Sequence, residues 1–460
     1  MSLLIKNGEI VTADSRYKAD VYCAGEQITC IGPNLEVPKG TKVIDAKGKY
    51  IFPGFIDPHV HIYLPFMGTF AKDDYVSASK AALVGGTTTL IEMCCPSRND
   101  ETLKSYQLWL SNAEGKSACD FTFHMGVARY DKKTEGELKE IVKAGISSFK
   151  VFLAYKNFFG VTDEELYHTL SLAKKLGVIT TAHCENPDLI AELQKKLLAE
   201  GKTGPKWHYW SRPPVVEAEG VHHLATFAEM TGAHVYCVHT SCEEALRAAI
   251  RARERGVKIW VETLIQYLTL DMTYAEKPNF EGSKFVMSPP LRHKKNQDVF
   301  WNGLAQGLVS TVATDHAPFD FKGQKDMGLK DFTKIPNGIP SLEDRMTVLW
   351  TKGVGEGRIN LHQFVDCAST QAAKLFGLFP RKGTVAVGAD ADLVIWDPKY
   401  RGTISAKNQY MNLDYNPFEG WKVTGRPSLV TVRGEVAVKD GKFVGKLGRG
   451  KLVKREPNHF

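Results

Sequence analysis

Both ends of the chain show short runs in which apolar and polar residues alternate. Over residues 3–52 these runs are separated by turn-forming pairs such as Asn7-Gly8 and Lys47-Gly48, and the same texture returns over residues 383–444. Alternation with a period of two predicts half-buried strands, and the Gly-containing pairs predict turns between them. We therefore expect residues 1–52 and 380–460 to meet in one small β-sandwich domain.

The middle of the chain follows a different pattern, in which longer apolar runs alternate with segments of helical periodicity, such as residues 163–176 and 242–255. Eight apolar runs are predicted strands: residues 54–62, 87–93, 121–128, 147–154, 178–184, 234–240, 258–264 and 311–317. This order is typical of βα units around a parallel sheet. It predicts an α/β fold, a (β/α)₈ TIM-like barrel over residues 53–379. A doubly wound sheet is the alternative, but no GxGxxG motif opens a helix.

Composition and charge narrow the class of protein. The 460 residues are 43% apolar and 24% charged, and 59 Lys and Arg against 52 Asp and Glu leave a net charge of +7. These values are typical of a globular protein and unlike those of disordered, collagenous or membrane-embedded chains. No Lys/Arg run with interleaved aromatic residues stands out, so we expect no nucleic-acid partner.

The cysteines and the apolar runs bear on location. Nine cysteines include no CxxC pair, so a disulfide framework is not expected and a reducing cytoplasm is the simpler interpretation. Met1 leads into an alternating strand rather than a signal-like run, and no apolar stretch approaches the ~20 residues that span a bilayer. We expect a cytoplasmic protein without a membrane partner.

Metal-binding side chains lie where several of the predicted strands end. His59 and His61 are two residues apart, so in an extended strand both imidazoles point to the same side. An isolated HxH pair is a weak signal, since packed or solvated histidines are common. His183, His239 and Asp315 close three further strands. Because a barrel gathers its strand ends at one mouth, these residues together predict a metal site.

Lys150 lies inside a run that is predicted to be a buried strand, where an unpaired ammonium is expensive. One interpretation is an ion pair with a carboxylate such as Asp315 or Glu262. The other is a lysine that loses its proton, reacts with carbon dioxide and becomes an anionic carbamate able to bridge two metal ions. Spacing does not separate the two, and the residues alone favour the ion pair.

Six longer motifs follow one another along the chain: GFIDPHVH at 54–61, SFKVFLAYK at 148–156, AHCEN at 182–186, MSPPLR at 287–292, TDH at 314–316 and KIPNG at 334–338. In this order they resemble the hydantoinase and dihydropyrimidinase branch of the cyclic amidohydrolases, over essentially the whole chain. The resemblance implies a homotetrameric, metal-dependent hydrolase. Its small-molecule substrates would be cyclic diamides, 5-substituted hydantoins or dihydropyrimidines, opened to N-carbamoyl amino acids.

The resemblance also implies a binuclear metal centre. Two divalent ions would bind at the barrel mouth, with zinc as the first expectation and manganese or cobalt as alternatives. His59, His61 and Asp315 would hold one ion, and His183 and His239 the other. Lys150, carboxylated by carbon dioxide to N6-carboxylysine, would bridge both, which reverses the preference for an ion pair. Glu185 is expected to support His183 rather than to bind metal.

Further residues are expected to act on the substrate. By resemblance, Tyr155 would stabilise the developing oxyanion, Asp315 would carry a proton to the leaving nitrogen, and main-chain atoms of Ser288 and Asn337 would hold the ring. Bulky apolar residues follow the first and fourth strands, where loops carry function. Our hypothesis is that Leu64, Phe152 and Phe159 contact the exocyclic substituent of a 5-substituted hydantoin and favour the D form.

Three other functions are alternatives to the hydrolysis of hydantoins and dihydropyrimidines. A dihydroorotase would carry an arginine two places after the second histidine, where this chain has Tyr63. An allantoinase-like enzyme is closer in chemistry, but the apolar mouth suits an aryl or alkyl substituent better than a ureido group. A non-enzymatic dihydropyrimidinase-related interaction protein would have lost metal ligands, and all six positions are intact here.

Overall fold

Eight parallel strands form a closed barrel in the computed structural model, which describes residues 2–457. The strands are β8 (Phe55–Val60), β11 (Thr87–Cys94), β12 (Asp120–Gly126), β13 (Ser148–Phe152), β14 (Ile179–His183), β15 (Val235–Cys237), β16 (Ile259–Leu264) and β17 (Thr311–Ala313). They pair in chain order, and a parallel bridge between Val60 and His316 joins the last to the first. The predicted barrel is confirmed, and each strand lies within or close to its predicted run.

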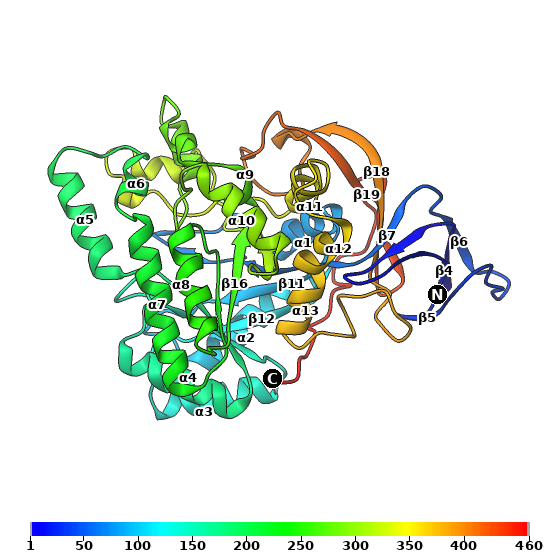
Figure 1. The fold of residues 1–460 in the computed structure, drawn as a ribbon, viewed down its shortest axis with the longest axis horizontal. Helices are drawn as coiled ribbons and strands as arrows, with labels where there is room; N and C mark the ends of the chain where they lie inside the picture. Colours follow the sequence, from blue (N-terminus) through cyan, green and yellow to red (C-terminus); the bar gives the residue numbers. More distant parts are fainter. Residues whose placement is uncertain (1, 458–460) are drawn as a thin grey trace.

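Helices surround the barrel, as Figure 1 shows. They are α1 (Tyr75–Val84), α2 (Thr102–Ala113), α3 (Lys132–Lys143), α4 (Asp163–Leu176), α7 (Pro214–Thr231), α8 (Glu243–Glu254), α10 (Lys295–Ala305) and α11 (Arg345–Leu349). In α4, Thr162 and Glu165 form a capping box, and Gly177 ends the helix with a φ of 68°. Further helices lie in the connections: α5 (Pro187–Ala199) and the short helices α6 (Trp207–Trp210), α9 (Ile265–Thr269), α12 (Leu361–Val365) and α13 (Gln371–Leu375). Among the described residues, no helix is long and apolar enough to cross a membrane.

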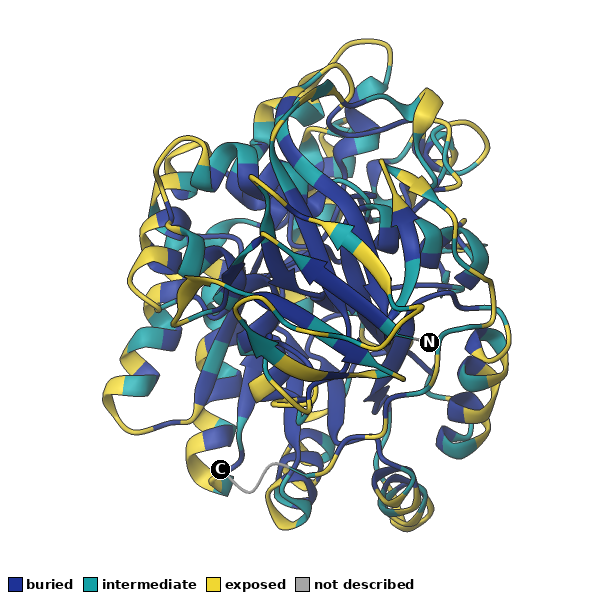
Figure 2. Ribbon diagram, turned by 90° about the vertical axis from the view of Figure 1, so that its right-hand side faces the viewer, coloured by how far each residue is buried: buried dark blue, intermediate teal, exposed yellow. Residues whose placement is uncertain are grey.

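The barrel strands are apolar because both of their faces are covered. Every residue of β8, β11, β12, β13 and β14 is buried. In Figure 2, buried residues in dark blue occupy the centre of the molecule, while the outer faces of the helices are exposed. Parallel strands buried on both faces require continuous apolar runs, which is the pattern that the middle of the sequence displays.

The two ends of the chain meet in sheets beside the barrel. One sheet has the order β5-β4-β1-β6, and the other has the order β21-β20-β19-β18-β7-β2-β3. Their strands are β1 (Ser2–Lys6), β2 (Glu9–Val11), β3 (Arg16–Lys18), β4 (Asp20–Ala24), β5 (Gln27–Gly32), β6 (Lys42–Asp45), β7 (Tyr50–Pro53), β18 (Leu393–Thr403), β19 (Lys422–Val432), β20 (Glu435–Lys439) and β21 (Lys442–Phe443). Antiparallel pairing of β7 with β18 joins the ends, and blue and orange strands adjoin in Figure 1. The predicted terminal β domain is confirmed.

A buried ionic cluster connects this domain to the barrel. Lys382 Nζ lies 2.8 Å from Asp120 at the start of β12, and 2.6 and 3.1 Å from Asp392 and Asp390 beside β18. Arg433, in the turn after β19, pairs with Asp120 as well. The three carboxylates are close enough to hold a metal ion, but the Lys382 ammonium already lies among them. Arg381 pairs with Asp390 at 3.0 Å, so three cations balance the three carboxylates, and the cluster ties the terminal domain to the barrel.

Candidate active site

The six predicted metal ligands come together at the carboxyl ends of the barrel strands. His59 and Lys150 lie in β8 and β13, and His183 is the last residue of β14. His61 directly follows β8, and His239 and Asp315 lie two residues beyond the ends of β15 and β17. Five of the six line one cavity, and His59 is completely buried beneath it. The mouth of a parallel barrel is where enzymes of this fold place their reacting groups.

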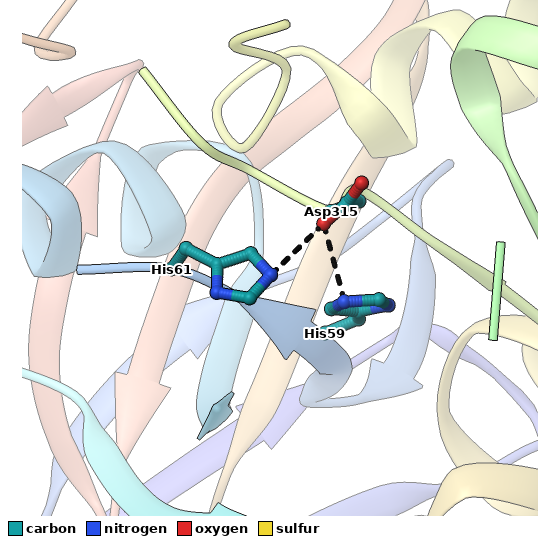
Figure 3. A group of neighbouring side chains, drawn as sticks. All are labelled: His59, His61 and Asp315. Carbon is teal, nitrogen blue, oxygen red and sulfur yellow. Dashed lines mark ion pairs between the residues drawn. The ribbon is translucent and has the colours of Figure 1, made fainter. Parts of the chain in front are cut away.

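His59, His61 and Asp315 form the tightest group (Figure 3). The Nε2 atoms of both histidines lie 3.1 Å from Asp315 Oδ1. One ligand atom from each residue lies within 4.8 Å of the others, as a shared cation requires. Burial alone would raise the pKa of Asp315, but the adjacent His59 and His61 outweigh it and lower that pKa. Asp315 is therefore an ionised carboxylate at neutral pH.

His183, His239 and Lys150 form the second part of the group. The rings of His183 and His239 meet edge to face, with centroids 4.6 Å apart, and His239 lies 5.3 Å from His59. Lys150 Nζ lies 4.6 Å from the centre of the Phe152 ring. It has no hydrogen-bond partner among residues 2–457, so the ion pair with Asp315 or Glu262 does not form. Burial lowers the pKa of this lysine.

The histidines are held from behind by carboxylates. Glu262 Oε1 lies 2.7 Å from His59 Nδ1 and also accepts the main-chain N–H of His239. Glu185 Oε2 lies 2.7 Å from His183 Nε2, the supporting position expected for it. A carboxylate on one ring nitrogen fixes the tautomer and turns the other nitrogen toward a metal. The side-chain environment thus leaves His59 Nε2 and His183 Nδ1 as the ligand atoms.

These contacts test whether the residues fit divalent cations. Because Glu262 Oε1 accepts the proton of His59 Nδ1, His59 Nε2 carries a lone pair, yet it faces a carboxylate oxygen of Asp315 at 3.1 Å. Two acceptors at that distance are favourable only with a cation between them. Buried His59 Nε2, His61 Nδ1, His239 Nδ1 and Lys150 Nζ have no hydrogen-bond partner in the described chain. Burial also lowers the pKa of His59 and His239 well below the ordinary value, so both are neutral, as metal ligands must be. The residues fit.

Three residues of the site have an unusual backbone conformation. Tyr155, His239 and Asp315 adopt left-handed φ values of 58°, 39° and 47°, which non-glycine residues seldom take. Such conformations cost free energy and cluster at functional sites. In each case the chain leaves its strand abruptly, so the side chain lies at the mouth rather than on the outer face of the barrel.

A polar wall lies across the mouth. Tyr155, Ser288 and Asn337 all line the cavity, and Asn337 Nδ2 donates to Ser288 Oγ at 2.9 Å. Burial raises the pKa of Tyr155, although the Arg212 guanidinium, 5.7 Å from its ring, opposes this. Tyr155 therefore keeps its proton at neutral pH and can donate a hydrogen bond.

An apolar wall adjoins it, with the ring centroids of Phe66 and Tyr155 5.4 Å apart. Leu64, Phe152 and Phe159 line the cavity, as the sequence hypothesis requires, and the structure adds Phe66 and Ala317. The Phe159 ring stacks on Phe152 and Phe66, with centroids 5.1 and 6.1 Å apart. The volume open to the centres of water-sized molecules is about 40 Å³, enough to hold water.

Sequence reasoning missed several supporting residues. Arg212, in the connection after α6, lies 2.5 Å from Glu185. Burial would raise the pKa of Glu185, but Arg212 and His183 bring it down to about 2. Phe66 belongs to the apolar run 64–67, which was expected near the mouth. It lies in the hairpin of β9 (Pro65–Phe66) and β10 (Thr69–Phe70), with its ring against Tyr155 and Phe159.

Similarity to known proteins identifies the family of this chain. The model of the amidohydrolase family matches residues 50–437, which include the whole barrel. The chain belongs to the amidohydrolase family. This family member binds divalent metal, in keeping with the group formed by His59, His61 and Asp315.

The similarity extends over the full length of individual family members. The chain is 66% identical to a D-hydantoinase (dihydropyrimidinase) from Thermus sp., with a TM-score of 0.98 and all of both chains covered. It is 50% identical to the D-hydantoinase of Geobacillus stearothermophilus, over 99% of this chain and 97% of that protein. A dihydropyrimidinase from Brevibacillus agri is 47% identical, with a TM-score of 0.97 and 99% of each chain covered.

Proposed function

We propose that the protein opens cyclic diamides, 5-substituted hydantoins and dihydropyrimidines, by hydrolysis to N-carbamoyl amino acids, with preference for the D enantiomer. The full-length similarity to D-hydantoinases and dihydropyrimidinases makes this amidohydrolase a hydrolase of cyclic amides. One observation of the site carries the proposal: unpartnered buried nitrogens and an ionised carboxylate adjoin a cavity with one polar and one apolar wall.

Two divalent ions, with zinc as the first candidate and manganese or cobalt as alternatives, would be held by the six residues at the strand ends. His59, His61 and Asp315 would hold one ion, His183 and His239 the other, and carboxylated Lys150 would bridge them. Burial without a partner supports this modification, because a lysine with a lowered pKa has the neutral amine that carbon dioxide requires. When bound, such ions polarise a carbonyl and make a water molecule nucleophilic near neutral pH.

The chain's own residues would supply the remaining steps. The Tyr155 hydroxyl, protonated at neutral pH, donates to the carbonyl oxygen as negative charge develops there. Asp315, ionised and at the mouth, accepts the proton of the attacking water and delivers it to the departing ring nitrogen. Main-chain atoms of Ser288 and Asn337 orient the ring, and the apolar wall takes the exocyclic substituent.

Tyr155→Phe is expected to lower kcat by about 10²–10³-fold, because the oxyanion loses one donor. KM and metal content should change little, since the ring is held elsewhere. The control is Tyr167→Phe on the exposed face of α4. Steady-state kinetics with a D-5-substituted hydantoin provide the measurement, and a kcat equal to that of the parent would exclude the oxyanion role.

Phe159→Ala is expected to reduce aryl-over-alkyl selectivity by about tenfold in kcat/KM, and to weaken D preference, because the stacked wall loses a ring. Phe379→Ala is the control, since Phe379 is 43% exposed and does not line the cavity. The ratios are measured with pairs of D and L substrates. Unchanged ratios in Phe159→Ala would show that Phe159 does not contact the substituent.

A substrate panel tests the function as a whole. Dihydrouracil, hydantoin, D- and L-5-substituted hydantoins, allantoin and dihydroorotate are assayed for ring opening with and without chelator. We expect turnover of the hydantoins and dihydrouracil, loss on chelation and recovery with zinc, manganese or cobalt. Preference for allantoin or dihydroorotate would replace the proposed substrate class, and no turnover by the metal-loaded protein would favour an interaction role.

We further propose a homotetrameric cytoplasmic enzyme whose terminal domain spans residues 1–52 and 380–460, with the barrel over residues 53–379. The position of the first boundary is supported by β7, which ends at Pro53 in the terminal sheet, directly before β8 begins in the barrel. Nine free cysteines suit a reducing compartment. Sedimentation velocity of the purified protein measures the oligomeric state.

A further inference from the structure

Lys325 is a buried lysine outside the reacting group. It begins the short 3-10 helix η3 (Lys325–Gly328), and its side chain is completely buried. Nζ donates to the carbonyl oxygens of Val286 and Gly338, at 2.8 and 2.6 Å. Burial lowers its pKa well below the ordinary value. A buried amine is costly, and an apolar side chain would fill the same space more cheaply, so these two contacts need a reason.

The two carbonyls belong to the segments that form the polar wall. Val286 lies two residues before Ser288, and Gly338 directly follows Asn337. The N–H of Gly338 also donates to the Val286 carbonyl, at 3.0 Å. Lys325 thus adds side-chain hydrogen bonds to the main-chain hydrogen bond between these two segments, which are far apart in sequence. It holds them where Ser288 and Asn337 both face the cavity.

The preceding residue, Gln324, contacts the hairpin that carries Phe66. Gln324 Nε2 donates to Thr69 Oγ1 at 2.7 Å and to the Phe70 carbonyl at 2.8 Å. Both acceptors lie on β10, which pairs with the strand that carries Phe66. Gln324 Oε1 accepts the N–H of Asp320, so its amide orientation is fixed. Two consecutive side chains therefore contact the segments that carry Ser288 and Asn337 of the polar wall and Phe66 of the apolar wall.

We propose that Gln324 and Lys325 are positioning residues that hold the segments of the two walls in place: Lys325 orders the ring-binding segments, and Gln324 orders the apolar hairpin. This role rests on the proposed function. Neither residue contacts the reacting group, and both act through the segments they hold. Lys325 should influence binding of every cyclic substrate, whereas Gln324 should influence only substrates with a bulky substituent.

The test uses the metal-loaded enzyme. Lys325→Met keeps the length of the side chain without its donors, Lys325→Gln keeps an amide donor, and Lys330→Met changes an exposed lysine nearby as the control. We expect KM of Lys325→Met to rise about tenfold for hydantoin and for substituted hydantoins, with a smaller change in kcat and parent metal content. Lys325→Gln should restore part of the affinity. Gln324→Ala should raise KM for 5-aryl hydantoins and leave unsubstituted hydantoin unchanged.

A second measurement does not depend on activity. Amide hydrogen exchange at residues 286–288 and 337–338 should become faster in Lys325→Met and stay as in the parent in Lys330→Met, because the Gly338 amide loses a neighbour that orders its acceptor. Unchanged exchange in Lys325→Met would show that Lys325 does not order the segments of Val286 and Gly338. Faster exchange with an unchanged KM would show that this ordering does not position the substrate. If the parent protein opens no cyclic diamide, the proposed function fails and the KM expectation fails with it. Hydrogen exchange still shows whether Lys325 orders the segments of Val286 and Gly338. If Lys325→Met does not fold, Lys325→Gln, whose shorter side chain keeps an amide donor, should change both measurements in the same direction by a smaller amount, and parent values in both would overturn the proposal.

Discussion

Lys150→Ala is expected to lose bound metal and ring-opening activity together, with turnover reduced by about 10³-fold or more. The reason lies in the charges of the site. Lys150 is completely buried among neutral histidines, and its Nζ has no partner in the described chain. As a carbamate it would supply the anion that two cations need between them, and alanine supplies neither charge nor ligand atom. Metal analysis and steady-state kinetics on the same preparation provide the measurement.

The control for this prediction is Lys156→Ala, which changes a surface lysine paired with Asp188 six residues along the same segment. Parent protein equilibrated with ¹³C-labelled bicarbonate should show one carbamate carbon signal that Lys150→Ala lacks. Full metal occupancy with full turnover in Lys150→Ala would rule out the carbamate, and so would absence of the labelled signal from active parent enzyme.

Asp315→Asn is expected to lower kcat by about 10³-fold or more, with a smaller loss of metal. The amide is nearly isosteric with the carboxylate but carries no charge and cannot accept the proton of the attacking water. Its oxygen remains close to the two histidine Nε2 atoms that lie 3.1 Å from the carboxylate, so part of the metal affinity should persist. Kinetics and metal content are measured after loading with excess metal.

The matched control is Asp320→Asn, because Asp320 lies on the same connection and pairs with Lys72 at the surface. Proton transfer by Asp315 also predicts a sign for the pH dependence. Its pKa is lowered, so the ionised form persists across neutral pH and activity that depends on it falls only toward acid pH. A metal-loaded Asp315→Asn enzyme with parent kcat would show that another group moves the proton.

The fold was largely predictable because its determinants are local. Continuous apolar runs follow from burial of parallel strands on both faces, and all eight strands were found from them. Their ends were less predictable. The predicted strands at 234–240 and 311–317 shorten to Val235–Cys237 and Thr311–Ala313. His239 and Asp315 adopt left-handed φ values, and such a turn has no signature in the apolar pattern.

By itself, the sequence determined the barrel, the meeting of the two termini and the candidate ligands, because strand periodicity and the position of a residue at a strand end are properties of neighbouring residues. Only the tertiary structure decided which groups meet. Lys150 has no hydrogen-bonded carboxylate in the described chain, and Glu262 is hydrogen-bonded to His59. Phe66 lines the mouth, and Lys325 is hydrogen-bonded to Val286 and Gly338. These contacts join residues that lie far apart in the chain, and closure of the barrel with the packing of its loops brings them together.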